Sequence, residues 1–196
     1  MPTPLKPVRT VAPASPLITL AEARVWCHED STDQDALLQL LIDAATSELD
    51  GMTGILGRCL IAQTWRFDFD SFAHEIRLPL APLIAVTSVS WKDAPGASQT
   101  VAPTVYHAVE DALSPVVRLA SGQSWPTPAI RPDAVSITAQ LGYGASATDV
   151  PGGIRFAAQL AIADGYANRE AQIVGTIVAE SLTRNRTLAG FRRLGL

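Results

Sequence analysis

The residues best suited to nucleophilic or metal chemistry are three histidines and two cysteines, and they are scattered along the chain. His28, His74 and His107 fall in a predicted helix end, a turn and a strand. Cys27 directly precedes His28, but adjacent helical residues point about 100° apart and do not readily share one metal ion. A thiol–imidazole dyad of Cys59 with His107 is chemically possible. Nothing in the sequence brings the two together, so the pattern favours a structural, partly buried thiol at Cys59.

Carboxylates gather between residues 19 and 57, where one arginine stands against eight acids for a net charge of −7. Asp30, Asp33 and Asp35 resemble part of a calcium-binding loop, but the loop glycine and the terminal bidentate glutamate are missing. Helix capping and a solvated helix face account for these acids without a metal ion. The sequence therefore predicts no metal site here.

Glycine-rich stretches lack the pattern of a nucleotide site. Gly142 and Gly144, like Gly152 and Gly153, have neither the spacing nor the following Lys-Ser/Thr of a phosphate-binding loop. Gly152 and Gly153 precede a predicted helix, so anion binding there is conceivable, with a flexible helix entry as the alternative. Neither a Gly-x-Ser-x-Gly elbow nor a His-Glu-x-x-His motif occurs. We therefore predict no catalytic, cofactor or metal residues from these motifs.

The elements that would hold these residues begin and end with helices. A capping box at residues 19–22 opens a predicted helix over 19–29. Leucines and alanines at spacings of three and four then predict a second helix over 33–54. Pro151 is typical of a first helical turn, and an alanine-rich apolar stripe predicts a third helix over 151–170.

Between the second and third helices the period changes from 3.6 to 2. Trp65, Phe67 and Phe69 alternate with charged residues and share one face of a predicted strand. Further short β-rich runs follow, joined by Pro- and Gly-containing turns, and predict a small antiparallel β module of five or six strands over 63–142. The expected fold class is α+β: a helical bundle with a small β module inserted between helices two and three.

Both ends of the chain differ from its body. Residues 1–18 form a proline-rich arm that we expect to be extended, and residues 19–175 form a single domain. Residues 176–196 carry a net charge of +3 and space apolar residues at helical intervals, so we expect this tail to be disordered alone and ordered against a partner protein. The tail residues assigned to that contact are Leu182, Arg184, Arg186, Leu188, Phe191, Arg192, Arg193 and Leu194.

Composition limits the function classes further. Of the 196 residues 47% are apolar, which is enough to bury a core, yet no apolar run approaches the roughly 18 residues of a membrane span. The net charge is −4, and an acidic body with basic ends lacks the clustered cations of a DNA-affinity surface. We expect no membrane insertion and no sequence-specific DNA binding.

The order of several short segments resembles a known family. The segments are residues 19–24 (TLAEAR), 61–65 (IAQTW), 78–83 (LPLAPL), 86–89 (VTSV), 125–126 (WP), 135–144 and 166–170 (YANRE). Together they are similar to the head–tail connector (adaptor) proteins of long-tailed double-stranded DNA phages, prophages and gene transfer agents. The resemblance covers about 19–170. Gly152 and Gly153 depart from it, because the family usually has a better helix former there.

The resemblance implies a structural subunit that is not an enzyme and has no catalytic residues. It implies a homo-oligomeric, twelve-fold ring below the portal protein, in the neck of a virion or phage-like particle assembled from protein made in the host cytoplasm. Such a ring extends the DNA channel and docks the next neck or stopper protein. The resemblance also makes the portal protein the expected partner of the basic tail. Two alternatives stay open from the residues alone. One is a small-molecule enzyme or ligand-binding domain with a pocket between the β module and the helices, and the other is a stopper or tail-terminator neck protein.

Overall fold

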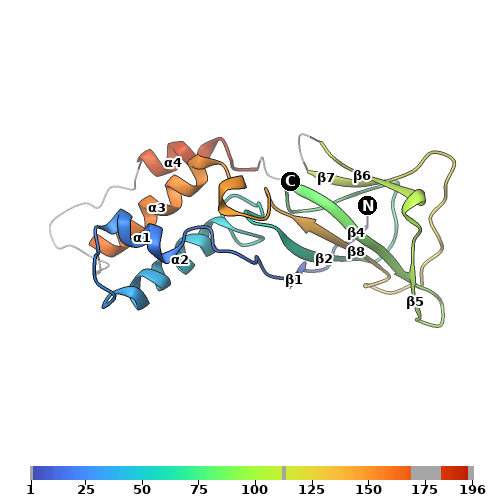
Figure 1. The fold of residues 1–196 in the computed structure, drawn as a ribbon. Helices are drawn as coiled ribbons and strands as arrows, with labels where there is room; N and C mark the ends of the chain where they lie inside the picture. Colours follow the sequence, from blue (N-terminus) through green and yellow to red (C-terminus); the bar gives the residue numbers. More distant parts are fainter. Residues whose placement is uncertain (1, 112–113, 169–181, 194–196) are drawn as a thin grey trace.

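The computed structural model describes residues 2–111, 114–168 and 182–193. The molecule is elongated, with the helices gathered at one end and the strands at the other (Figure 1). Within the described residues there are four α-helices and eight strands, and two short 3₁₀ turns at Pro103–Val105 and Ala147–Asp149. None of the helices described is both long and apolar enough to span a membrane.

The helical end is built around α3 (Gly152–Ala167), which contacts α1 (Leu20–Cys27), α2 (Asp35–Leu49) and α4 (Leu182–Ala189). The predicted capping box opens α1, because the Thr19 side chain accepts from the Glu22 backbone and the Glu22 carboxylate accepts from the Thr19 backbone. Apolar stripes of the helices meet in one core. Its fully buried large side chains include Leu17, Ile18, Leu38, Leu49, Leu56 and Leu60.

Helix α2 ends before the predicted boundary at 54. Asp50 leaves the helix with an extended backbone (φ −94°, ψ 143°), and Gly51 follows with φ of +76°, a left-handed conformation that favours glycine. The chain then turns back through residues 51–58 toward the sheets. The apolar spacing that suggested a longer helix continues through Met52, but that side chain is largely exposed.

One antiparallel sheet has five strands in the order β1-β2-β8-β4-β5. Its strands are Val8–Val11, Gln63–Phe69, Val135–Leu141, Leu83–Lys92 and Ser98–Thr100 in that spatial order. The long pairing of β2 with β8 sets Trp65 opposite Ala139 and Phe67 opposite Ile137. The three aromatic residues predicted to share one face of β2 are all buried.

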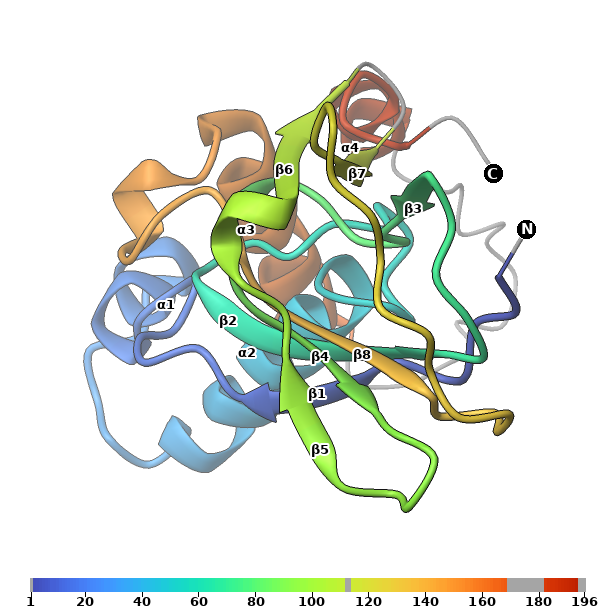
Figure 2. The ribbon, with the colours of Figure 1, turned by 90° about the vertical axis from the view of Figure 1, so that its right-hand side faces the viewer.

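A second antiparallel sheet has three strands in the order β3-β7-β6, with bounds Glu75–Arg77, Pro115–Leu119 and Tyr106–Glu110. Residues from both sheets fill a second core, in which Phe67 and Ile137 of the larger sheet lie with Val117 of the smaller one. Viewed along the molecule, the smaller sheet lies above the larger (Figure 2).

The predicted fold class is wrong in its proportions. Helices do not form a bundle that carries a small β module. The part of the chain that the structure describes has eight strands in two sheets, with a core separate from the helical core. Alternation along the chain reveals that strands exist, but sheet membership depends on pairing between distant segments. β1 comes from the proline-rich arm, outside the range expected to be β.

The arm runs from the β end to the helical end. At one end Thr3 donates its backbone N–H to Asp70 at 2.9 Å, and β1 pairs with β2. At the other end Leu17 and Ile18, each 1% exposed, lie in the helical core. The arm therefore contacts both halves of the molecule.

Candidate functional site

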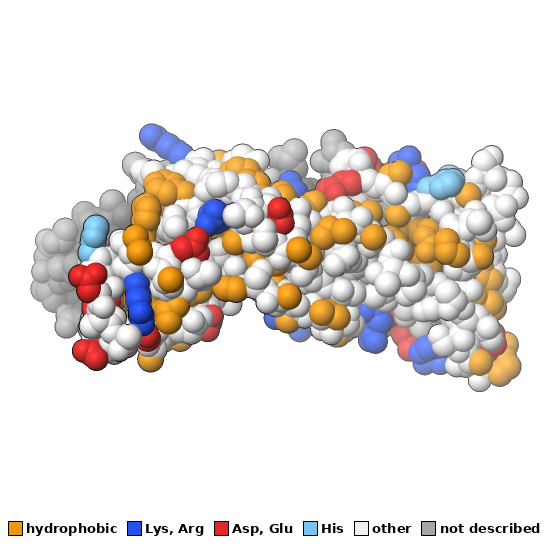
Figure 3. Space-filling view, in the orientation of Figure 1, with side chains coloured by type: hydrophobic (Ala, Val, Ile, Leu, Met, Phe, Trp, Pro, Cys, Tyr) orange, Lys and Arg blue, Asp and Glu red, His pale blue; other side chains and the backbone are white. Residues whose placement is uncertain are grey.

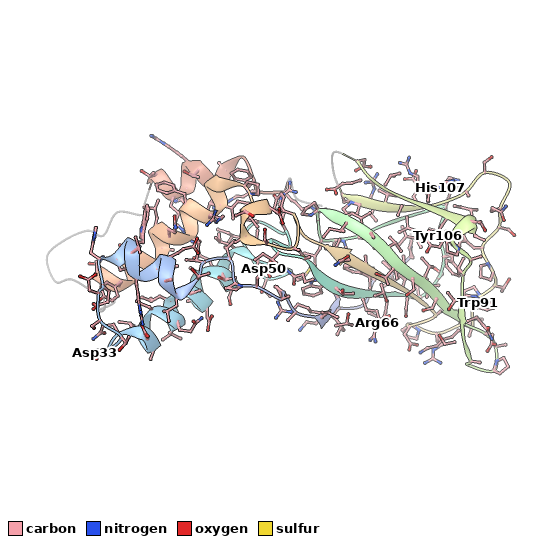
Figure 4. All side chains as sticks on the ribbon, viewed as in Figure 1. Asp33, Asp50, Arg66, Trp91, Tyr106 and His107 are labelled. Atoms are coloured by element: carbon pink, nitrogen blue, oxygen red, sulfur yellow. The ribbon has the colours of Figure 1, made fainter. Side chains whose placement is uncertain are left out.

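A buried polar network lies where the two halves meet. Asp50, with its side chain 8% exposed, accepts from the backbone N–H of Leu60 at 2.7 Å and from the side-chain amide of Gln63 at 2.9 Å and 3.0 Å. Gln63 in turn accepts from the indole N–H of Trp65 at 3.1 Å. Figure 4 shows Asp50 between the helices and the sheets. The network joins the end of α2 to the start of β2.

The pKa values of Asp50 and of the nearby Cys59 are both shifted by burial. Burial raises the pKa of the Asp50 carboxyl, and the hydrogen bonds from Gln63 and from the Leu60 backbone oppose that rise. Arg9 of the arm lies 3.8 Å from the Asp50 carboxylate and supplies a positive counter-charge. Burial also raises the pKa of the neighbouring Cys59 thiol, so Cys59 is held in the protonated form, which is a poor nucleophile.

A groove of about 750 Å³ opens beside the network. Its walls come from the arm, from the C-terminal half of α2 and from the start of β2, and Leu17, Ile42, Met52 and Trp65 give it much of its apolar lining. It lies where a pocket between β residues and helices was anticipated for a ligand-binding domain. Among the residues described, its lining includes no histidine or cysteine that could act as a base or nucleophile.

The structure leaves the scattered candidates of the sequence apart. His107 is exposed on β6 and Cys59 is buried in the β core, so the two do not form a dyad. Figure 4 shows His107 far from Asp50, the neighbour of Cys59. Cys27 is half-buried at the end of α1, and burial raises the pKa of its thiol.

The acids of the first helices are also accounted for individually. Arg24 donates from Nε to Asp35 at 2.7 Å and forms an ion pair with it, whereas Asp30 and Asp33 are exposed. In the parts of the chain that are described, no cluster of three or more His, Cys, Asp or Glu side chains could hold a metal ion.

The tail residues assigned to a partner divide into two groups. Leu188 is fully buried in the helical core, and Phe191 packs against that core, so these two side chains do not form a free apolar edge. Leu182 is the first residue of α4. Leu194 lies outside the described residues.

Of the four arginines of the tail, two contact other parts of the chain and two are exposed. Arg184 forms an ion pair with Glu48 of α2, and Arg193 donates to the backbone carbonyl of Pro79. Arg186 and Arg192 are exposed and make no ion pair or hydrogen bond with the residues described. The tail is further fixed by Arg58, which donates from Nε to the Phe191 carbonyl at 2.8 Å.

Gly153 explains how α4 approaches α3 so closely. A Cβ on Gly153 would lie 2.9 Å from Phe191 Cε2 and 3.2 Å from Thr187 Cγ2. A Cβ on Gly152 would meet nothing within 4 Å. The pair that sequence reasoning treated as a flexible helix entry or an anion site is therefore, at Gly153, a packing contact for the tail.

Sequence reasoning did not single out Asp50, Gln63 or Trp65 as a set. A signal was present, because Asp50 and Gln63 flank the change from helical to alternating period. A polar residue at the end of an apolar helix and another at the start of an apolar strand are placed to satisfy each other. Nothing in the sequence indicates which of many such residues meet.

Comparisons with known proteins give a fold and no family. No protein-family model matches the chain, and no curated protein matches it in sequence. Three solved structures match over 98% of this chain and 97% of theirs. They are the neck of an empty GTA particle computed with C6 symmetry (TM-score 0.78, 22% identity), the virion of a native gene transfer agent (0.80, 23%) and the neck of a native GTA particle computed with C12 symmetry (0.73, 22%). The chain thus has, over its full length, the fold of chains in those assemblies.

Proposed function

We propose that the chain is a structural subunit of the neck of a phage-like particle, such as a gene transfer agent or a tailed phage. Within the neck it acts as a head–tail connector: it forms a ring below the portal, extends the DNA channel and docks the next neck protein. The observation that carries the proposal is the fold match, which spans both halves of the molecule in each of three particle structures.

Symmetry supports the ring. Two of the matching structures were computed with C6 and C12 symmetry, so the chains of this fold in them repeat around an axis. A cyclic arrangement requires each subunit to present two different surfaces, one to each neighbour. An elongated molecule with distinct helical and β ends offers such surfaces along both sides. Twelve-fold symmetry agrees with the stoichiometry implied by the sequence resemblance.

A structural role also fits the chemistry of the described residues. The buried polar groups at the junction satisfy one another, and the thiol beside them is protonated. The tail, which the sequence suggested as the portal contact, uses Leu188 and Phe191 within its own chain. We therefore propose portal contact as a property of the ring without assigning it to those two residues.

Particles made with and without this chain test the proposal. Purified particles should contain the chain, and its deletion should give DNA-filled heads that lack tails when imaged by electron microscopy. A complementing copy should restore tailed particles, and a copy carrying Phe67→Asp, which places a charge in the β core, should not. Normal necks formed without the chain would contradict the proposal.

The groove beside Asp50 is the one feature that favours a ligand-binding domain instead. Thermal denaturation in the presence of a panel of small metabolites separates the two functions. A neck subunit should show no ligand-dependent rise in Tm, whereas the stability of a binding domain rises with the logarithm of the ligand concentration above Kd. A stopper or tail terminator would instead be located by its level within the reconstructed neck.

A further inference from the structure

The two sides of the helical end carry different helices. In Figure 2, α1 lies at the left and α4 at the upper right, with α2 and α3 between them. Both α1 and α4 contact α3. A molecule packed side by side with copies of itself would therefore present α4 to one neighbour and α1 to the other.

The α4 side is basic where it is exposed. Arg186 and Arg192 are its exposed cations, and neither makes an ion pair or hydrogen bond with the described parts of the chain. Their neighbours Ala189 and Gly190 are also exposed, so a surface can approach this side of the helix closely. Arg184 and Arg193, in contrast, are held by Glu48 and by the Pro79 carbonyl.

The α1 side combines an apolar patch with acids. Val25, Trp26 and Phe156 are exposed by 78%, 38% and 37%, and the rings of Trp26 and Phe156 meet edge to face with centroids 5.9 Å apart. We call these three residues the α1 patch. Hydrophobic side chains are visible over the helical end in Figure 3. Exposed apolar side chains grouped in this way mark a contact surface.

Two free carboxylates lie beyond the α1 patch, in the connection from α1 to α2. Asp30 and Asp33 are exposed, and their side chains form no ion pair with the residues described. Figure 4 shows Asp33 at the tip of the helical end. The other acids of this side are engaged, since Glu22 pairs with Arg155 at 2.7 Å and Asp35 pairs with Arg24.

We infer that the exposed side of α4 packs against the α1 side of a second copy of this chain, with Arg186 and Arg192 facing the carboxylates of Asp30 and Asp33. The charges are complementary, they lie on opposite sides of one subunit, and each set lacks a partner within its own described chain. A contact between two different surfaces repeats head to tail, and it closes into a ring when the rotation between neighbours divides a full turn. The inference rests on the proposed ring function and names the residues that build it.

The apolar residues and the charged residues contribute differently to this contact. The α1 patch supplies the apolar area, whereas exposed ion pairs mainly fix register and accelerate encounter. Ion pairs at the rim are screened over about 10 Å at 0.1 M salt. Assembly should therefore weaken as the salt concentration rises, without being lost.

Cysteine cross-linking tests the contact. Ser31 and Ala189 are exposed, one beside the acids and one on α4. A chain carrying both Ser31→Cys and Ala189→Cys, treated in purified particles with a short bismaleimide, should give a ladder of covalent multimers. Each single variant should give no ladder beyond dimers, and the wild-type chain controls for Cys27. Particles that contain the double variant but yield no ladder would overturn the inference while leaving the neck function intact.

Charge reversal provides a second, independent test of the contact. Arg186→Glu with Arg192→Glu should reduce the cross-linked ladder at least tenfold, and adding Asp30→Arg with Asp33→Arg should restore it. Lys6→Glu, a reversal of an exposed charge on the arm, is the control and should leave the ladder unchanged. If the arginine reversals release the chain from portal while the ladder persists, the arginines serve the portal and the inference is wrong. A ladder from the isolated protein with no chain in particles would instead overturn the neck function alone.

Discussion

Replacing Gly153 with alanine should push α4 away from α3. The added Cβ would lie 2.9 Å from Phe191 Cε2, whereas carbon atoms in contact lie about 3.5–4.0 Å apart. Overpacking of this kind costs about 1–3 kcal/mol, and alanine recovers at most about 1 kcal/mol through its helix propensity. We expect a net loss of about 1–2 kcal/mol in the free energy of unfolding, or about 2–8 °C in Tm for a chain of this length.

Gly152→Ala is the matched control, because its Cβ meets nothing within 4 Å. Its free energy of unfolding should stay within about 0.5 kcal/mol of the wild-type value. Thermal denaturation gives Tm, and trypsin cleavage at Arg184 and Arg186 reports whether α4 has detached, since a released helix is cut faster. In a Phe191→Ala background the cost of Gly153→Ala should largely disappear. Equal Tm values for the two alanine variants, or an undiminished cost without the Phe191 ring, would refute the packing argument.

Three further changes test other parts of the molecule. Leu188→Ala should lower the free energy of unfolding by about 2–5 kcal/mol, because it leaves a cavity at a buried position. Thr183→Ala, on the exposed side of α4, should change the free energy of unfolding little. Chemical denaturation measures both. Asp50→Asn should lower the free energy of unfolding by about 1–3 kcal/mol. The new amide N–H₂ group would face the Gln63 N–H₂ group, and Gln63 cannot turn over because its Oε1 accepts from Trp65. An unchanged denaturation midpoint would argue against the network. The Thr19 backbone N–H holds the pKa of Glu22 below its ordinary value of 4.5, so the stability this carboxylate contributes is present above pH 4.5 and is lost as the pH falls through the lowered pKa. Glu22→Gln should flatten that acid-side loss in a pH series of thermal melts.

Local features of the fold could be predicted from the sequence. The capping box at Thr19, the helical stripes and the alternating aromatic residues of β2 all depend on neighbours along the chain, and all are present in the structure. Sheet membership could not be predicted in this way. β3 pairs with β7 across about forty residues, and β1 pairs with β2 across more than fifty. Strand pairing over such separations leaves no period in the sequence.

The tail shows a second limit of sequence-based prediction: an apolar stripe can be recognised, but the surface that covers it cannot. The three-residue spacing of Leu188 and Phe191 predicts one apolar edge. Both side chains do pack on the helical core, although Phe191 follows the end of α4. Periodicity does not say what covers that edge. The covering surface is the chain's own α3, and its sequence signal was Gly153, the residue whose missing side chain makes room for the Phe191 ring. A glycine beside a helix start can thus indicate a packing contact as well as flexibility.

The arm has a mechanical consequence for the proposed ring. It is fastened to the sheet by backbone hydrogen bonds at one end and by Leu17 and Ile18 in the helical core at the other. Bending one half of the subunit against the other would have to strip β1 from β2 or withdraw two fully buried side chains, at a cost of about 1.5–3 kcal/mol for each. The two halves of the subunit should therefore move together as one rigid body. A displacement at its helical end would be transmitted to its β end, so that a ring of such subunits would tilt as a set of rods.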